Sequence, residues 1–214
     1  MISAVAFDMD GLMFNTEDVY WKTASTYLQR RGHEYNHEVA NDVMGRPPKY
    51  CFEKMIEYYG LSDTWEALHA ESEETFIKLL DEGYSMMPGL PELLDQLEEL
   101  NIPKAVCTSS SQRVAREVLG RAGVWERFQF VLAFEDIVRG KPDPEIYLKA
   151  ASKFGVTSEK MLVLEDSVSG CHAARNAGAV TVAVLADHNR SLDFSHATRI
   201  AQRLDDPVIW NLLK

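Results

Sequence analysis

The chain has 214 residues, of which 46% are hydrophobic and 26% charged, a composition typical of a folded protein and too apolar for a disordered one. A formal net charge of -11 leaves no general basic surface, which argues against nucleic acid and against a membrane as main partner. Three cysteines without a C-x-x-C pair indicate neither a disulfide framework nor a zinc site, and the N-terminal apolar run is too short for a signal peptide, so a cytoplasmic location is expected.

The first predicted element in chain order is a buried strand over Ile2–Phe7, which ends abruptly at Asp8. Similar short apolar runs recur along the chain, separated by stretches with helical spacing such as Leu90–Leu100 and Gln112–Ala122. These further runs are Lys104–Cys107, Phe128–Ala133, Met161–Leu164 and Val180–Leu185. Strands that alternate with helices predict a parallel α/β sheet.

Residues 15–85 show a different pattern, with no strand-like run. Apolar residues recur at helical spacing in Val19–Arg31, Lys49–Tyr59 and Trp65–Leu80. We therefore predict a helical cap domain at residues 15–85, inserted after the first strand of an α/β core formed by residues 1–14 and 86–214. The two chain segments that connect this cap domain to the core would pass beside the end of the first strand. This position would allow the cap domain to act as a lid.

Polar clusters follow the predicted strands, and ligands of open α/β sheets bind outside the carboxyl ends of the strands. We therefore expect these clusters to converge at one edge of the sheet. They are Asp8 with Asp10, Thr108–Ser111, Lys141, and Glu165 with Asp166.

This set of side chains suits phosphoryl transfer. Several carboxylates at one site require a hard cation, and oxygen ligands without His or Cys favour Mg²⁺. Asp8 suits attack on phosphorus to form an aspartyl-phosphate, and Asp10 suits proton transfer to the leaving oxygen and from water. The charge of Lys141 and the hydroxyl of Thr108 suit the oxygens of a transferring phosphoryl group.

Four segments of the chain, FDMDGLMFNTE, VCTSS, RGKPDPEIY and VLEDSVSG, resemble the ordered motifs of the haloacid dehalogenase-like phosphohydrolases. The helical insert and the phrase KPDPEIY resemble the branch that holds phosphoglycolate phosphatases, β-phosphoglucomutases and pseudouridine-5′-phosphatases. The resemblance implies a Rossmann-like core with a helical cap and Mg²⁺-dependent hydrolysis of a small phosphate ester, of the sugar phosphate or nucleoside monophosphate type. A monomer is expected, with a homodimer as the alternative.

The resemblance also implies roles for individual residues, which fall into three groups. The catalytic pair would be Asp8 as nucleophile and Asp10 as general acid and base. The metal ligands would be Asp8, Asp10 through its backbone carbonyl, Asp166 and, as an outer ligand, Glu165. The phosphate ligands would be Thr108, Lys141 and the backbone amides of Met9 and Ser109.

Substrate specificity is expected to come from the helical segment. The resemblance makes the turn with Gly45 and Arg46 the specificity loop, where Arg46 would grip a second phosphate or a sugar hydroxyl. Tyr20 stands where the mutases of this branch carry a histidine, and the stretch 71–74 lacks their lysine. Both departures favour a hydrolase, and a sugar-phosphate mutase stays as the alternative.

Other interpretations apply to single residues. Thr108 or one of the serines after it would cap a helix that begins near Gln112, and Ser167 with the acids before it would cap the next helix. Lys141 lies between prolines, where a solvent-exposed lysine is common. No role is assigned to the six histidines.

Two other functions are less consistent with the sequence. A dehalogenase would need neither a metal nor Asp10, and a non-catalytic protein would be expected to lack at least one of the motif residues.

Overall fold

The computed structural model describes residues 1–43 and 46–214. Six strands within these ranges form one parallel sheet in the order β3-β2-β1-β4-β5-β6. The strands are β1 (Ala4–Phe7), β2 (Lys104–Cys107), β3 (Val131–Leu132), β4 (Met161–Glu165), β5 (Val180–Val184) and β6 (Arg199–Ala201). The predicted parallel α/β sheet is therefore confirmed, and β6 is a strand that the sequence pattern did not predict.

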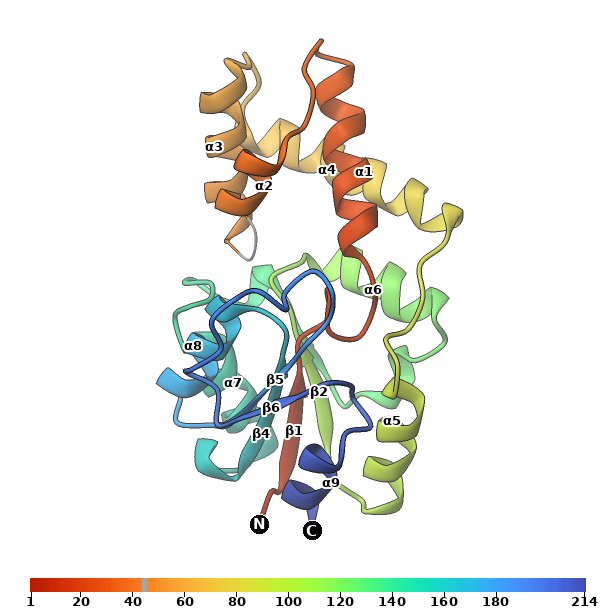
Figure 1. Ribbon diagram of the computed structural model, residues 1–214, viewed down its shortest axis with the longest axis vertical. Helices are drawn as coiled ribbons and strands as arrows, with labels where there is room; N and C mark the ends of the chain where they lie inside the picture. Colours follow the sequence, from red (N-terminus) through yellow and green to blue (C-terminus); the bar gives the residue numbers. More distant parts are fainter. Residues whose placement is uncertain (44–45) are drawn as a thin grey trace.

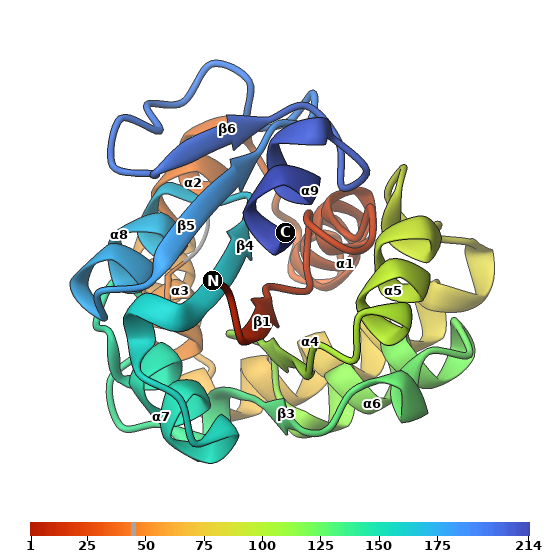
Figure 2. The same ribbon diagram turned by 90° about the horizontal axis from the view of Figure 1, so that it is seen from below.

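Helices cover both faces of the sheet (Figure 2). On one face, Val5 and Phe7 pack in a cluster with α5 (Leu90–Glu99), α6 (Gln112–Arg121) and α9 (Pro207–Leu213). On the other, Ala4 and Ala6 pack with α7 (Glu145–Phe154) and α8 (Val168–Asn176). Because successive side chains of a strand point to opposite faces, a strand covered on both sides is apolar throughout, as β1 is.

The helical segment lies over the carboxyl ends of the strands (Figure 1). It consists of α1 (Glu17–Gln29), α2 (His37–Val43), α3 (Pro48–Tyr59) and α4 (Trp65–Leu79). These helices share a hydrophobic cluster of their own, which includes Tyr27, Phe52 and Leu68. Two of their side chains, Val19 and Phe76, instead belong to the cluster that covers the sheet, so the helical segment packs on the core.

Two chain segments connect the helical segment to the core, and they run side by side. The amide of Asn15 donates to the carbonyl of Ser85 over 3.1 Å, and the amide of Met87 donates to the carbonyl of Met13 over 2.8 Å. This antiparallel pairing lies where the sequence pattern places the ends of a cap domain, at residues 15 and 85. Within the described ranges no helix is both long enough and apolar enough to cross a membrane.

Candidate active site

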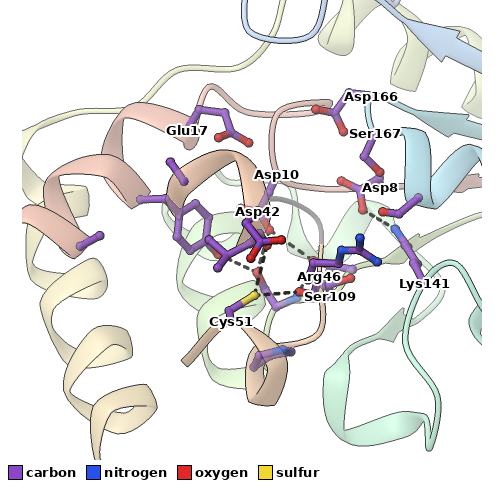
Figure 3. A pocket seen from close by; sticks show the side chains of 18 of the residues that line it. Asp8, Asp10, Glu17, Asp42, Arg46, Cys51, Ser109, Lys141, Asp166 and Ser167 are labelled. Carbon is purple, nitrogen blue, oxygen red and sulfur yellow. Dashed lines mark hydrogen bonds and ion pairs between the residues drawn. The ribbon is translucent and has the colours of Figure 1, made fainter. Parts of the chain in front are cut away.

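Asp8 and Asp10 follow the central strand β1, beside the ends of its neighbours β2 and β4. The amide of Asp8 donates to the carbonyl of Leu164 over 3.0 Å, which continues the β1–β4 pairing and fixes the backbone. The Asp8 side chain is only 11% exposed, and its Oδ1 accepts a hydrogen bond from Lys141 Nζ at 2.5 Å (Figure 3). The first of the two carboxylates thus faces a cation.

Asp10 faces hydroxyl groups instead. Its Oδ1 accepts from Thr16 Oγ1 at 2.8 Å, and its Oδ2 accepts from Ser110 Oγ at 2.7 Å and from Thr108 Oγ1 at 3.3 Å. Burial raises the pKa of the Asp10 carboxyl, and these three hydrogen bonds lower it only in part. A raised pKa favours the protonated form of the carboxyl, which is the form a general acid needs.

Lys141 links Asp8 to the end of β4. Besides Asp8, its ammonium donates to Glu165 Oε1 at 2.6 Å and to the carbonyl of Cys107 at 3.0 Å, so all three donors have protein acceptors. Burial works against the charged ammonium, but the carboxylates of Asp8 and Glu165 outweigh it and raise the pKa of Lys141. The lysine is 3% exposed, which excludes the solvent-exposed alternative.

Glu165 is fully buried and does not line the cavity described below. Its Oε1 also accepts from the Tyr147 hydroxyl at 2.6 Å, and its Oε2 accepts from Ser167 Oγ at 2.9 Å. The carboxylate is therefore held on several sides, and it in turn fixes the lysine beside Asp8.

Gly170 in α8 leaves the space that the Glu165 carboxylate occupies. A Cβ at this position would lie 1.8 Å from Glu165 Oε1. Because Glu165 is bound by Lys141 and Tyr147, it cannot swing away freely, and we expect Gly170→Ala to lower the free energy of unfolding by about 1–3 kcal/mol.

Gly120→Ala is the matched control for this prediction, since Gly120 lies in α6 and a Cβ there would meet no atom within 4 Å. Replacing a helical glycine by alanine without strain stabilises by about 0.5–1 kcal/mol. Urea unfolding of both variants measures the difference, and equal midpoints would contradict this account of Gly170.

Asp166 contributes to two groups of possible metal ligands. Asp8, Glu165 and Asp166 place one carboxylate oxygen each within 4.8 Å of one another. In the second group, a carboxylate oxygen of Asp166, one of Glu17 and a ring nitrogen of His188 lie equally close together. Burial raises the pKa of Asp166, with the charge of Glu165 as the next cause. Closely spaced acids with oxygen donors are the setting in which Mg²⁺ is bound, so the first group fits that ion.

The backbone of Gly11 passes close to Asp166. A Cβ on Gly11 would lie 2.2 Å from Asp166 Oδ2, and the residue has a φ of +77°, in the left-handed region. The same oxygen, Asp166 Oδ2, lies 2.7 Å from His188 Nε2, and that nitrogen would lie 3.0 Å from the Cβ on Gly11. Asp166 is thus packed closely against an imidazole and against a loop position that only glycine fits easily.

The serine-rich loop after β2 (Thr108–Ser111) both caps helix α6 and contributes hydroxyl groups to the site. Ser111 caps α6 by accepting from the amide of Val114 at 3.2 Å, while Thr108 and Ser110 contact Asp10. The capping alternative for Thr108 is therefore wrong. In α8 the cap is Ser167, whose Oγ accepts from the amide of Gly170 at 3.0 Å.

A cavity of about 1070 Å³ lies between this edge of the sheet and the helical segment. Of the predicted site residues, Asp8, Asp10, Thr108, Ser109, Lys141, Asp166, Tyr20 and Arg46 line it. Met9 is fully buried and does not line it, and the role predicted for Met9 concerns only its backbone amide. Gly45 lies outside the described residues.

Some contacts of the site were not predicted. Thr16, which does not line the cavity, and Ser110, which belongs to the predicted cluster 108–111 but was given no role of its own, both bind Asp10. Glu17 lines the cavity beside Asp166. His188 contacts Asp166 although no histidine was assigned a role. His188 lies shortly after the end of β5 (Val180–Val184), as Asp166 lies directly after β4. The rule that ligands bind beyond the carboxyl ends of parallel strands therefore applies to His188 as well.

A family model described as haloacid dehalogenase-like hydrolase matches residues 5–184. The chain belongs to the haloacid dehalogenase-like hydrolases, and the resemblance of its motifs to that family is confirmed.

Its relatives include enzymes named for phosphate esters. The chain is 34% identical over 181 residues to the phosphorylated carbohydrates phosphatase of Thermotoga maritima, covering 83% of this chain and 82% of that protein. It is 31% identical over 211 residues to the probable pseudouridine-5′-phosphatase of Drosophila melanogaster, covering 96% of this chain and 91% of that protein. This chain is likewise a phosphatase.

The fold is shared with a solved structure of β-phosphoglucomutase from Clostridium difficile. The TM-score is 0.86 at 20% identity, with 100% of this chain and 97% of that chain covered. At this identity the likeness concerns the fold alone.

Proposed function

We propose that the chain hydrolyses a small phosphate monoester through an aspartyl-phosphate on Asp8, with Mg²⁺ as cofactor. The observation that carries the proposal is the different surroundings of two adjacent acids: Asp8 faces Lys141, and Asp10 faces three hydroxyls. Burial raises the pKa of the Asp8 carboxyl, and the Lys141 ammonium opposes that rise by favouring the ionised form. Burial also raises the pKa of the Asp10 carboxyl, which favours the protonated form that a general acid needs.

In the first step Asp8 Oδ2 attacks phosphorus while Lys141 holds Oδ1. The bond from phosphorus to the ester oxygen breaks, and that oxygen takes the proton of Asp10. In the second step a water attacks phosphorus and gives a proton to Asp10, while the bond from phosphorus to Asp8 Oδ2 breaks. Inorganic phosphate leaves, and both carboxyls return to their starting states.

Asp8 and Asp166 would hold the Mg²⁺, together with the backbone carbonyl of Asp10, and Glu165 would act as an outer ligand. When bound, the ion would neutralise the clustered carboxylates and the charge of the phosphoryl group. Thr108, Ser109, Lys141 and the amide of Met9 would bind the phosphoryl oxygens. Of these, Lys141 would have to exchange one of its present acceptors for phosphate.

We further propose that residues 15–85 act as a cap over this site. The support is the cavity between the helical segment and the sheet edge, and the paired connections at Asn15 and Ser85. Such a cap would exclude water from the phosphoryl group until the leaving group has departed.

Phosphate release from p-nitrophenyl phosphate in the presence of Mg²⁺ tests the proposal. Treatment with EDTA is expected to lower turnover by at least about 10²-fold, because a metal ion contributes several kcal/mol of charge stabilisation. Added Mg²⁺ should restore it. Full turnover after EDTA treatment would contradict the role of the cation.

A sugar-phosphate mutase is the second candidate, and Tyr20 argues against it. The hydroxyl of Tyr20 lies 2.7 Å from Ser110 Oγ, which binds Asp10, so Tyr20 is tied to the general acid rather than free to act as a histidine would. With β-glucose 1-phosphate and glucose 1,6-bisphosphate supplied together, we expect more inorganic phosphate than glucose 6-phosphate. The reverse ratio would establish the mutase.

A further inference from the structure

A short turn after β5 holds Asp166, which is one of the proposed metal ligands. Asp166 is the first residue after β4, and its side chain lies close to that of Asp8 at the cavity (Figure 3). The turn at residues 186–189 follows the neighbouring strand β5, so it reaches the same edge of the sheet. Two of its side chains, His188 and Asn189, contact Asp166. The turn therefore holds this residue at two separate points.

Asn189 fixes the backbone of Asp166. Its Nδ2 donates to the carbonyl of Asp166 at 2.8 Å and to the carbonyl of Val184 at 3.1 Å. Its Oδ1 accepts from the amide of Ala186 at 2.8 Å. Both donors and the oxygen of this side chain are thus bonded, and the residue is only 1% exposed. Asn189 therefore ties the turn to the ends of both β4 and β5 and keeps the neighbouring His188 beside Asp166.

His188 contacts the carboxylate of Asp166 itself. Its Nε2 lies 2.7 Å from Asp166 Oδ2. An ionised carboxylate only accepts hydrogen bonds, so an Asp166 that binds a metal ion requires a proton on this nitrogen. A hydrogen bond donated to Oδ2 restrains rotation of the carboxylate about its Cβ–Cγ bond. Carboxylates that bind metals are typically oriented by hydrogen-bonding partners of this kind.

The alternative role for His188 is that of a direct metal ligand, since its ring lies in one group with Glu17 and Asp166. Two arguments oppose it. Mg²⁺ takes oxygen ligands in preference to imidazole. In addition, a nitrogen that donates its proton to Asp166 Oδ2 has no lone pair left for a cation. The geometry thus favours a role through Asp166.

We propose, on the basis of the proposed function, that His188 is a positioning residue, which orients the Asp166 carboxylate for Mg²⁺ without binding the ion. Loss of its hydrogen bond would let the carboxylate rotate and would weaken the preorganised set of ligands. Removal of such a partner typically lowers metal affinity by about 10–100-fold.

Binding of Mn²⁺ tests this inference, because Mn²⁺ suits the same oxygen ligands as Mg²⁺ and the EPR signal of the free ion measures its affinity. His188→Asn should raise the dissociation constant by about 10–100-fold, since the shorter side chain cannot place its amide where Nε2 lies. His188→Gln is the matched rescue. Its longer side chain carries an amide donor close to the position of Nε2 and should restore most of the affinity.

Phosphate release provides a second readout. In His188→Asn the Mg²⁺ concentration that gives half of the maximal turnover should rise by a similar factor, and saturating Mg²⁺ should recover most of kcat. His196→Asn is the control, because it makes the same change on the same connection after β5. The Nδ1 of His196 lies 3.0 Å from Arg175 Nη1, and His196 does not line the cavity. The control should keep the affinity and kcat of the parent.

The outcomes separate this inference from the proposed function. A parent enzyme that binds no Mn²⁺ and hydrolyses esters without a metal would refute the proposed cofactor, and the inference with it. If the parent binds Mn²⁺ but His188→Asn binds it equally tightly, or if His188→Gln binds it as weakly as His188→Asn, the phosphatase stands and the inference is overturned.

Pulsed EPR of Mn²⁺ bound to the parent enzyme adds a test that needs no variant. We expect no modulation from a nitrogen bonded directly to the ion, because the proposed ligands of the metal are oxygens. A directly bonded imidazole nitrogen that disappears in His188→Gln would make His188 a ligand and would overturn the positioning role.

Discussion

Asp8→Asn is expected to lower kcat for phosphate release by at least about 10³-fold, because an amide cannot attack phosphorus and form the acyl phosphate. At about 1.4 kcal/mol for each factor of ten, this corresponds to a loss of more than about 4 kcal/mol of transition-state stabilisation. The substitution keeps an oxygen that can accept from Lys141, so the fold should persist.

Asp81→Asn makes the same chemical change at an exposed ion pair with Arg121 and should leave kcat unchanged. Circular dichroism should show the same secondary structure in both variants. Phosphate turnover of Asp8→Asn within a few-fold of the parent would contradict the nucleophilic role of Asp8.

Lys141→Ala is expected to have the largest effect on stability. It would leave the buried carboxylates of Asp8 and Glu165 without a cation, and Glu165 is fully buried. Removing one partner of a buried ion pair costs about 3–5 kcal/mol, which is a large part of the 5–15 kcal/mol that typically stabilises a folded domain. Urea unfolding measures the change.

The double variant Lys141→Ala with Glu165→Gln should regain part of that loss, since one uncompensated charge is removed with the lysine. Lys22→Ala is the control, because its pair with Glu82 is more than half exposed on both sides and such pairs contribute at most about 1 kcal/mol. Equal destabilisation by Lys141→Ala and Lys22→Ala would show that the buried network is not what holds this edge of the sheet.

Much of the core could be predicted because its strands are buried on both faces. Runs such as Lys104–Cys107 coincide with the observed strand β2, and helices α5 and α6 begin at the predicted residues. β6 escaped prediction because only Ala201 of its three residues is buried, so it shows no apolar run. The seven-residue helix α2 is likewise too short to display a helical period.

The site could be predicted less completely than the fold. The rule that ligands bind at the carboxyl ends of parallel strands was enough to bring Asp8, Lys141 and Asp166 together. It could not distinguish Ser110 from its neighbouring serines, because the choice depends on the direction in which each hydroxyl points. The contact between Tyr20 and Ser110 joins residues 90 positions apart, and no local pattern reports it.

Trapping the covalent intermediate tests the central claim most directly. The enzyme is mixed with ³²P-labelled p-nitrophenyl phosphate and Mg²⁺, quenched in acid within the first turnover, and digested so that the labelled peptide can be identified by mass spectrometry. We predict hydroxylamine-sensitive phosphate on Asp8, absent from Asp8→Asn. Turnover with no label on the protein, or with label on another residue, would contradict the account.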